Sequence, residues 1–364
     1  MEDKLKGILE AVKPLDEAAM EAARKRQMIL AKPPGSLGRL EDLSVQLAGI
    51  TGKVNNTVAR QHLLVFAADN GVVEEGVSSA PQSVTLMQTI NLTRAKTGAS
   101  VLARHFGCGM TVCDVGVNAV IKEPAVLNRK IAFGTQNMTK GPAMTRQQAV
   151  RAILTGVELA EDTPADVLGI GEMGIGNTTT SSAVLSVLLG VEPEQVTGRG
   201  GGVTDEGFRK KKEAIQKAIE GNRPDPADVV DVLSKVGGFD IAAMCGAFLG
   251  CALTRRPVVI DGFISAVAAL CAVRLCPNVK DFLIPSHASF EIGYRMAMEE
   301  MGLTPIFQLG MRLGEGSGCP LAFQVLRAAC AVMNDMATFD QAGIDDGYLE
   351  EIRQGDKFSV EGKA

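Results

Sequence analysis

Six runs of mainly apolar residues alternate with longer stretches of helical pattern along the middle of the chain. They span residues 62–69, 110–117, 166–172, 257–263, 281–287 and 305–316. A strand that is buried on both faces is apolar almost throughout, and helices between such strands cover the two faces of a parallel sheet. The pattern therefore predicts an α/β protein built on six parallel strands.

Both ends of the chain show a helical pattern instead. Apolar residues recur at helical spacing in 15–31 and in 37–50, and the segment 32–38 between them carries prolines and glycine that end the first helix. Residues 325–340 predict another helix, and a charged tail follows it. A length of 364 residues also favours one large domain with a smaller unit.

Most of the predicted strands end in polar residues or glycine. These ends are Asp69-Asn70-Gly71, Asp114 and Gly116, Glu172, Asp261-Gly262, Ser286-His287 and Glu315-Gly316. Because ligands of open α/β sheets bind outside the carboxyl ends of the strands, we expect these groups to form a common site. The alternative is that they are ordinary turns between strands and helices.

The glycine-rich segment 169–183 follows a predicted strand and opens a helix, with Asn177 or Thr178 as its predicted N-cap. Its glycines allow backbone N–H groups to approach an anion at the start of the helix. The segment contains G-x-G-x-x-G, but it follows about the third predicted strand and encloses an acid, so it is weak evidence for a dinucleotide.

A second glycine-rich segment, 197–214, leads into a basic helix start that contains Lys211. Flexible backbone followed by lysines could close over a phosphate group, whereas a mobile surface loop with a solvated charged face is the alternative. The sequence contains no G-x-x-x-x-G-K-[ST], so it does not predict a P-loop nucleotidase.

Composition narrows the class of protein. A net charge of −5, no Trp and two Tyr argue against nucleic acid or an anionic membrane as a partner. We expect neither a membrane span nor a signal peptide, because no apolar stretch is long enough and the N-terminal segment is charged. The eight cysteines form no C-x-x-C pair and only three histidines occur, so we expect no zinc site. Most of the cysteines are typical of core residues in a reducing cytoplasm.

Two isolated acids stand at predicted strand ends within glycine loops, Glu172 and Glu315. His287 is the only histidine at a predicted strand end, and no G-x-S-x-G elbow accompanies it. A carboxylate that is partly removed from water has a raised proton affinity and can act as a general base. The residues alone therefore predict an α/β enzyme that handles a small phosphorylated ligand with a carboxylate base.

A family resemblance rests on several long motifs that occur in matching order between about residues 15 and 340. They are KPPGSLGRLEDLSVQLA (32–48), ADNGVVEEGVSSAPQSVT (68–85), NLTRAKTGAS (91–100), GEMGIGNTTTSSA (171–183), DVLSKVGGFDIAAMCG (231–246), VVIDGFISAVAAL (258–270), LIPSH (283–287) and MRLGEGSG (311–318). On these motifs the chain resembles the nicotinate-nucleotide–dimethylbenzimidazole phosphoribosyltransferases, enzymes of cobalamin biosynthesis.

The resemblance implies a Rossmann-like six-stranded parallel sheet flanked by helices. It implies a small helical domain from residues 1–50 plus 325–364, a catalytic domain over 51–324, and a homodimer. The implied reaction moves the phosphoribosyl group of nicotinate mononucleotide onto a benzimidazole nitrogen, giving α-ribazole 5′-phosphate and nicotinate. The family needs no redox cofactor and no obligatory metal.

The resemblance also implies roles for individual residues, with Glu315 as the catalytic base. The pocket for the aromatic base is expected to include Ala80, Met87, Gln88, Glu172, Met173 and Leu313. The phosphate and ribose sites are expected to include Gly174, Gly176, Asn177, Thr178, Gly202, Lys211, Asp261, Ser286, Gly314 and Gly316. Family members commonly carry Ser where this chain has Ala80, which leaves the preferred lower-ligand base open.

Two other classes of protein compete with the transferase. A NAD-dependent oxidoreductase needs an acid about 20 residues beyond the glycine loop, at the end of a strand. Residues 190–197 hold Glu192 and Glu194 but show no strand before them, so this class fits poorly. A non-catalytic carrier of a nucleotide or benzimidazole would keep the pocket and tolerate loss of Glu315.

Overall fold

The computed structural model describes residues 1–349. The chain forms two compact units: Met1–Lys13 with Arg60–Ala322, and Pro14–Ala59 with the described residues from Phe323 onward. These units differ from the expected boundaries, because residues 1–13 belong to the larger unit and residues 51–59 and 323–324 belong to the smaller. Helix α1 (Glu2–Ala11) packs against α6 and α11 of the larger unit, with Leu5 and Ile8 buried. Residues 350–364 of the expected helical domain lie outside the described residues.

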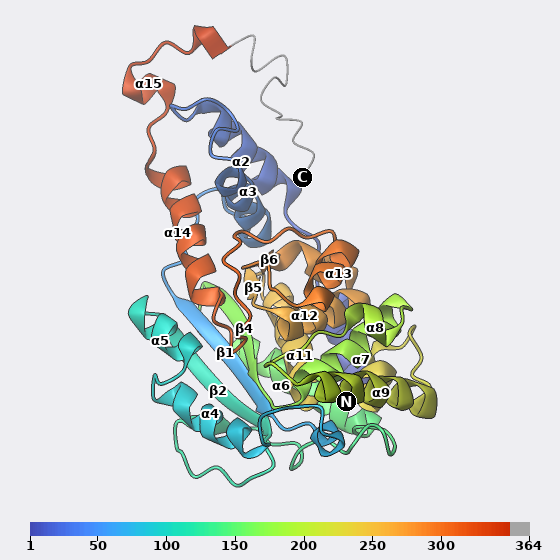
Figure 1. The fold of residues 1–364 in the computed structure, drawn as a ribbon. Coiled ribbons are helices and arrows are strands. Elements are labelled where there is room, and N and C mark those ends of the chain that lie inside the picture. Colours follow the sequence, from blue (N-terminus) through green and yellow to red (C-terminus); the bar gives the residue numbers. More distant parts are fainter. Residues whose placement is uncertain (350–364) are drawn as a thin grey trace. The chain divides into compact units, whose positions relative to one another are not determined.

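The larger unit contains a six-stranded sheet in the order β3-β2-β1-β4-β5-β6, with every neighbouring pair parallel (Figure 1). Its strands are β1 (Gln61–Ala68), β2 (Gly109–Gly116), β3 (Val126–Asn128), β4 (Val167–Met173), β5 (Val258–Ile260) and β6 (Leu283–Pro285). Every residue of β4 is buried, so both faces of that strand are covered, as successive side chains point to opposite faces. The predicted α/β class with a six-stranded parallel sheet is confirmed.

One of the six predicted strands is wrong. Residues 305–316 form an irregular segment with a single parallel bridge, between His287 and Phe307, and the sixth strand of the sheet is β3. Gly310 and Gly314 in this segment have φ of +64° and +86°, which a strand does not allow. Strand β3 was not predicted because it has only three residues, which pair with β2 at the edge of the sheet. Three residues are too few to show an apolar pattern in the sequence.

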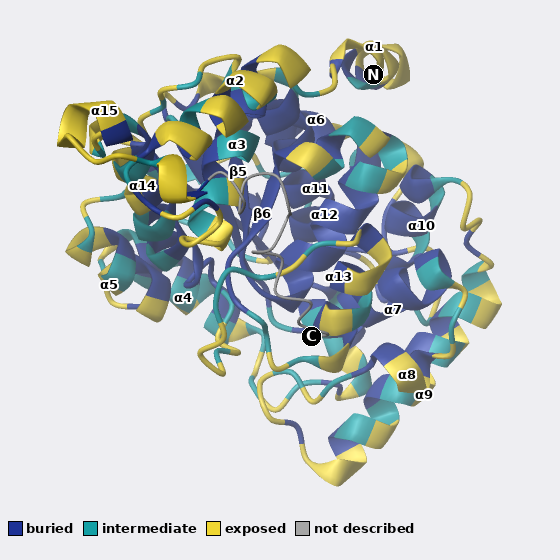
Figure 2. Cartoon of the chain, turned by 90° about the horizontal axis from the view of Figure 1, so that it is seen from above, coloured by how far each residue is buried: buried dark blue, intermediate teal, exposed yellow. Residues whose placement is uncertain are grey.

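Helices surround the sheet within the larger unit. Figure 2 shows α11 and α12 almost wholly buried, and α4 and α5 pack on the β1–β2 half of the sheet. The helical elements that follow α1 in this unit are η1 (Gly71–Glu75), α4 (Ser83–Thr93), α5 (Gly98–His105), α6 (Arg146–Asp162), α7 (Asn177–Leu189), α8 (Pro193–Val196), α9 (Asp205–Asn222), α10 (Val229–Val236), α11 (Phe239–Leu253), α12 (Phe263–Leu275), η2 (Pro277–Phe282) and α13 (Ile292–Met301).

The smaller unit is helical. Its elements are α2 (Glu17–Ile29), α3 (Arg39–Thr51), α15 (Phe339–Ala342), η3 (Gly347–Leu349) and the part of α14 (Cys319–Asp335) that follows Ala322. Ala19, Ala23, Ala48 and Met333 form its buried core. The break predicted at 32–38 is present, and there the buried Lys32 pairs with Glu41 at 2.8 Å. The helix expected over 325–340 starts earlier, at Cys319, and ends at Asp335.

Helices α6 and α11 pack so closely that glycine is required where they cross. A Cβ atom at Gly246 would overlap the carbonyl oxygen of Ile153, and one at Gly156 would overlap that of Ala243. Both clashes are with backbone, so a side-chain rotation cannot relieve them. Direct backbone contact between the two helices therefore sets their separation.

We predict that Gly246→Ala destabilises the protein by about 1–3 kcal/mol, because the added methyl group must push the two helices apart. The measurement is the free energy of unfolding in urea. Gly221→Ala in α9 is the matched control, since a Cβ atom there meets nothing within 4 Å. A stability of Gly246→Ala equal to that of the control would contradict the packing argument.

Candidate active site

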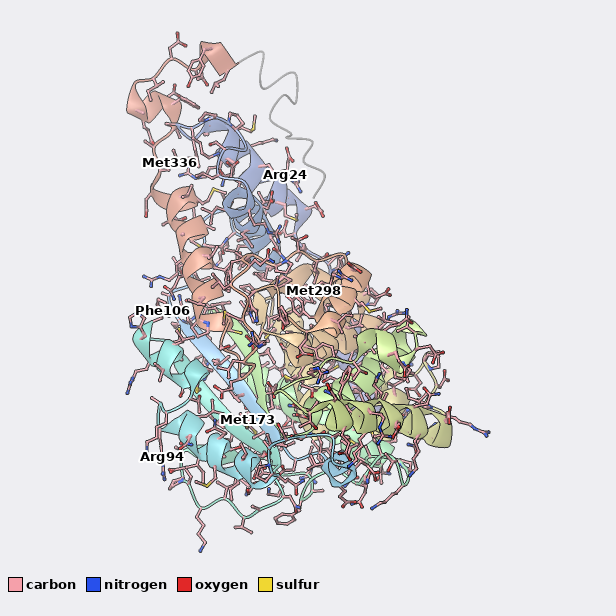
Figure 3. The ribbon with its side chains drawn as sticks, in the orientation of Figure 1. Arg24, Arg94, Phe106, Met173, Met298 and Met336 are labelled. Carbon is pink, nitrogen blue, oxygen red and sulfur yellow. The ribbon has the colours of Figure 1, made fainter. Side chains whose placement is uncertain are left out.

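A cavity of about 270 Å³ opens at the carboxyl ends of β4, β5 and β6 in the larger unit. Glu172 and Met173 at the end of β4 line it, and Figure 3 labels Met173. Asp261 follows β5, His287 follows β6, and the segment before α14 brings Glu315 to the same place. The strand ends at Asp69 and Asp114 do not line this cavity. The predicted common site therefore gathers only part of the polar strand ends.

The structure brings most of the predicted site residues together. The cavity is lined by Ala80, Gln88, Glu172, Met173, Gly174, Gly176, Asn177, Thr178, Asp261, Leu313, Gly314 and Glu315.

The other predicted residues do not line the cavity. Met87 points to solvent, with 58 % of its surface exposed. Lys211 is buried behind the lining and donates from Nζ to Thr178 Oγ1 at 2.9 Å. Gly202 lies outside, although its neighbours Gly200 and Gly201 line the cavity.

Ser286 and Gly316 are also outside the lining. Each lies beside Asp261: the Ser286 hydroxyl donates to the Asp261 carbonyl at 3.3 Å, and the Gly316 N–H donates to its Oδ2 at 2.9 Å. Both residues therefore form hydrogen bonds with Asp261 and do not line the cavity.

Sequence reasoning missed several residues of the cavity. Its further polar lining consists of Ser78, Ser79, Arg199, Ser265, Ser289, Glu291 and Arg312, and its further apolar lining of Val77, Val84, Ile175, Val203, Phe263 and Ile264. Arg199 and Ser289 stand close in sequence to predicted groups, within the second glycine segment and two residues after His287. The position of Arg199 in a glycine loop is a sequence signal for a site residue. The apolar lining residues have no such signal, because their sequence pattern is the same as that of core residues.

Glu315 is buried, with 4 % of its surface exposed, and its backbone has φ of +62°, in the left-handed region that non-glycine residues rarely adopt. The N–H of Ala99, in the first turn of α5, donates to its Oε2 at 3.1 Å. The positive end of the α5 dipole therefore faces this carboxylate. Thr97 and Ser100 form a capping box there, a pattern that marks the helix start in the sequence.

Glu172 is a second buried carboxylate beside Glu315. The Glu315 N–H donates to its Oε1 at 3.2 Å, and Asn177 Nδ2 donates to its Oε2 at 2.5 Å. Asn177 also donates to Asp240 at 2.9 Å, so one amide joins two acids. Burial raises the pKa of Glu172 to about 8 and that of Asp240 to about 6. At neutral pH Glu172 is thus mainly protonated.

Asn177 has a different local role from the predicted one. Helix α7 begins at Asn177, and Gly176 with φ of +94° is the N-cap. Asn177 is therefore the first helical residue, and its side chain is free to bond Glu172 and Asp240 because it does not cap the helix.

Asp261 and His287 share the next part of the site. Burial raises the pKa of Asp261 to about 7, against the effect of the N–H groups that donate to it. Burial lowers the pKa of His287 to about 4, so this imidazole is neutral. Its Nδ1 lies 3.0 Å from Ser286 Oγ and 3.8 Å from Asp261 Oδ1.

Lys211 supplies a cation next to the glycine segments. Burial lowers the pKa of its ammonium group to about 8, while the charge of Glu291 acts in the opposite direction. Besides Thr178, the ammonium donates to the Gly198 carbonyl at 3.1 Å. Both glycine segments thus meet at this one lysine.

Within residues 1–349, no group of three or more His, Cys, Asp or Glu side chains has a geometry that could hold a metal ion. The helices of this part of the chain are also too short or too polar to cross a membrane.

Comparisons with known proteins agree with this geometry. A family model described as a phosphoribosyltransferase matches residues 12–344. A nicotinate-nucleotide–dimethylbenzimidazole phosphoribosyltransferase of Clostridium tetani is 49 % identical over 96 % of this chain and 98 % of its own, and one of Clostridium perfringens is 48 % identical over 98 % and 99 %.

Solved structures agree as well. The enzyme of the same name from Thermus thermophilus superimposes with a TM-score of 0.86 at 39 % identity, over 92 % of this chain and 100 % of its own. A second structure from that organism, titled CobT, gives 0.87 at 40 % identity, over 91 % and 100 %. The chain therefore belongs to the nicotinate-nucleotide–dimethylbenzimidazole phosphoribosyltransferase family of pentosyltransferase enzymes.

Proposed function

We propose that this enzyme transfers the phosphoribosyl group of nicotinate mononucleotide to dimethylbenzimidazole or a related lower-ligand base. The products are α-ribazole 5′-phosphate and nicotinate, and the reaction serves cobalamin biosynthesis. One observation carries the proposal: the buried carboxylate of Glu315 lines the cavity and accepts a hydrogen bond through Oε2 alone, from the N–H of Ala99. Among the described residues no other group donates to this carboxylate, which leaves Oε1 for a substrate N–H.

A single general base is enough for this reaction. One ring nitrogen of the benzimidazole attacks C1′ with its lone pair, and the other nitrogen carries a proton that becomes acidic as the bond forms. Glu315 accepts that proton and prevents a full positive charge on the product. The pyridinium of the nucleotide leaves as neutral nicotinate nitrogen, so the leaving group needs no acid.

The protonation state of Glu172 supports the assignment of Glu315 as the general base. With its pKa raised to about 8 by burial, it is neutral over most of the physiological range and adds no second charge beside Glu315. Two negative charges in the same buried site would disfavour each other. A neutral Glu172 leaves Glu315 as the acceptor for the proton, and we assign Glu172 to the wall between the base and the ribose.

We assign the phosphate to the space between the two glycine segments. Gly176 and Thr178 of the first segment and Gly200 and Gly201 of the second line the cavity on this side. The Lys211 ammonium donates to Thr178, so it lies close behind the lining. Backbone N–H groups and one ammonium are a common combination for phosphate binding.

The aromatic base is assigned to the side of the cavity lined by Ala80, Gln88, Met173 and Leu313. Thioether and aliphatic side chains form an adaptable apolar wall. Ser78 and Ser79 line the cavity beside Ala80, so hydroxyl groups remain near the position where the family commonly has Ser. Met87, which points to solvent, is left out of this pocket.

The carrier and the oxidoreductase make different demands on the protein. A carrier gains nothing from a general base, and an oxidoreductase needs an acid for the ribose hydroxyls at the end of the next strand. That strand, β5, ends next to Asp261, which lies 78 residues beyond Ala183, the last residue of the first glycine segment. The homodimer implied by the family stays a prediction, and so does the cytoplasmic location, which the eight free cysteines support.

We predict that Glu315→Gln lowers kcat about 10²- to 10⁴-fold, the usual contribution of a general base. The assay follows nicotinate release and α-ribazole phosphate formation from nicotinate mononucleotide and dimethylbenzimidazole. Substrate binding by calorimetry and thermal unfolding should change little, because Gln keeps the size of the side chain.

Glu161→Gln is the matched control, since Glu161 is exposed in α6 and outside the cavity. Normal turnover by Glu315→Gln would remove Glu315 as the base. Absence of product from the unchanged enzyme with benzimidazole, purine and phenol acceptors would remove the transferase assignment.

We predict that kcat/KM for nicotinate mononucleotide falls as the pH rises through about 8. The lowered pKa means that Lys211 is charged below this pH and loses its proton above it, and a neutral amine attracts phosphate less. The measurement is kcat/KM between about pH 6.5 and 9.5, a range that brackets the expected inflection. Because Glu172 also has a pKa of about 8, the variants are compared in a Glu172→Gln background. There Lys211→Met should lose this inflection, whereas Lys217→Met, exposed in the same helix, should keep it. A pH profile of Lys211→Met identical to that of its parent enzyme would contradict the assignment of Lys211 to the phosphate site.

We predict that Ala80→Ser changes the choice of base without lowering kcat for the preferred one. A hydroxyl at the cavity wall favours acceptors that can form a hydrogen bond, such as 5-hydroxybenzimidazole, over dimethylbenzimidazole by about 10-fold in kcat/KM. Competition between the two acceptors gives this ratio directly. An unchanged ratio would show that residue 80 does not contact the base.

A further inference from the structure

The catalytic turn, residues 314–318, holds Glu315 in a conformation that its own sequence disfavours. A left-handed φ at a non-glycine residue costs of order 1–2 kcal/mol, so other contacts must hold this backbone in place. Gly314 and Gly316, with φ of +86° and +87°, make the turn possible on either side, but glycine does not enforce a conformation. The groups that bond the backbone of the turn must therefore supply the constraint.

Asp261 supplies two of these bonds. The Gly316 N–H donates to its Oδ2 at 2.9 Å, and the Gly318 N–H donates to its Oδ1 at 2.7 Å. One carboxylate thus binds the backbone on both sides of Ser317, directly after the catalytic glutamate. Bonds from N–H groups to a buried carboxylate are stronger than those between neutral groups, so this pair of bonds can restrain the turn.

The surroundings of Asp261 leave little room for a second role. Only 2 % of its surface is exposed, and the N–H of Gly262 also donates to its carboxylate. The neutral ring of His287 lies against Oδ1, with Nδ1 at 3.8 Å. A carboxyl group whose two oxygens already accept three backbone N–H groups has little capacity left for ribose hydroxyls.

We propose that Asp261 is a positioning residue for the general base: it clamps the catalytic turn through the Gly316 and Gly318 N–H groups and so aims the Glu315 carboxylate at the acceptor nitrogen. This inference rests on the proposed function and replaces the assignment of Asp261 to the phosphate or ribose. The role requires two acceptor oxygens on one side chain, which Asp provides and Asn does not.

Asp261→Asn tests the clamp, because one oxygen becomes an NH₂ group that faces an N–H of the turn. We expect kcat to fall about 10- to 100-fold, the effect of moving a catalytic group by about 1 Å. KM for nicotinate mononucleotide should change less than about threefold. A raised KM with unchanged kcat would instead make Asp261 a ligand of the nucleotide and overturn the proposal.

The double variant Asp261→Asn/Glu315→Gln separates positioning from an independent role. If Asp261 acts only through Glu315, the double variant is no slower than Glu315→Gln alone. Multiplied losses would overturn the proposal. An acceptor with a more acidic N–H, such as 5-nitrobenzimidazole, should reduce the loss in both single variants, since it needs less help from a base. A structural defect would lower the rate with every acceptor alike.

Gly318→Ala disturbs the same clamp from the other side and leaves Asp261 intact. Its Cβ atom would overlap His287 Nδ1 and would lie 2.5 Å from Ser286 Oγ and 3.0 Å from Asp261 Oδ1, so the turn is pushed away from all three groups, the Asp261 carboxylate included. We expect the same fall in kcat and the same partial recovery with the acidic acceptor. Unchanged kcat in a folded Gly318→Ala protein would overturn the clamp even if Asp261→Asn failed to fold.

Two controls accompany these variants. Asp162→Asn removes an exposed carboxylate at the end of α6, and Gly221→Ala adds a methyl group in open space. Both should keep full activity. The unchanged enzyme is assayed first with the natural pair of substrates: no product there contradicts the proposed function, whereas normal product with unaltered activity in Asp261→Asn and Gly318→Ala contradicts only the clamp.

Discussion

Buried acidic side chains need hydrogen-bond partners, and this requirement organises the carboxyl edge of the sheet. Glu172, Asp240, Asp261 and Glu315 are each almost wholly buried, and burial without partners would cost several kcal/mol for each group. Their donors are backbone N–H groups of the neighbouring loops and the amide of Asn177. The loops must therefore adopt an arrangement that provides hydrogen bonds for all four acids together.

Glycine makes this arrangement sterically possible. A Cβ atom at Gly171 in β4 would meet the carbonyl of Glu315 at 2.5 Å, so the catalytic turn lies directly on the strand. At Gly98, at the start of α5, a Cβ atom would overlap the side chain of Leu313. The glycines of the site thus serve two purposes, since some allow a left-handed turn and others allow close approach of two backbones.

The same arrangement divides the acids by function. All three acids line the cavity, but Glu172 and Asp261 accept N–H groups of the turn, whereas Glu315 keeps one carboxylate oxygen without a donor among the described residues. Sequence spacing cannot draw this distinction, because all three acids follow apolar runs and are flanked by glycine. The hydrogen bonds that tell them apart join residues 55 to 216 positions apart.

Much of the fold could be predicted from apolar runs, and the failures have identifiable causes. Five of the runs are strands because a buried strand needs apolar side chains on both faces, and this leaves a strong pattern. The run at 305–316 is also mainly apolar, but it forms an irregular segment. Its glycines have positive φ, and the Gly316 N–H donates to Asp261 and not to a neighbouring strand. β3 pairs too few residues for its pattern to stand out.

The sequence by itself determined the α/β class, the family and the residues near the site, because composition, periodicity and long motifs are local properties. Only the tertiary structure decided which groups meet. It brought Ala99 to Glu315, joined Lys211 to Thr178 and assigned the oxygens of Asp261 to the catalytic turn. The physical reason is that a hydrogen bond between distant segments depends on packing and leaves no periodic signal in the chain.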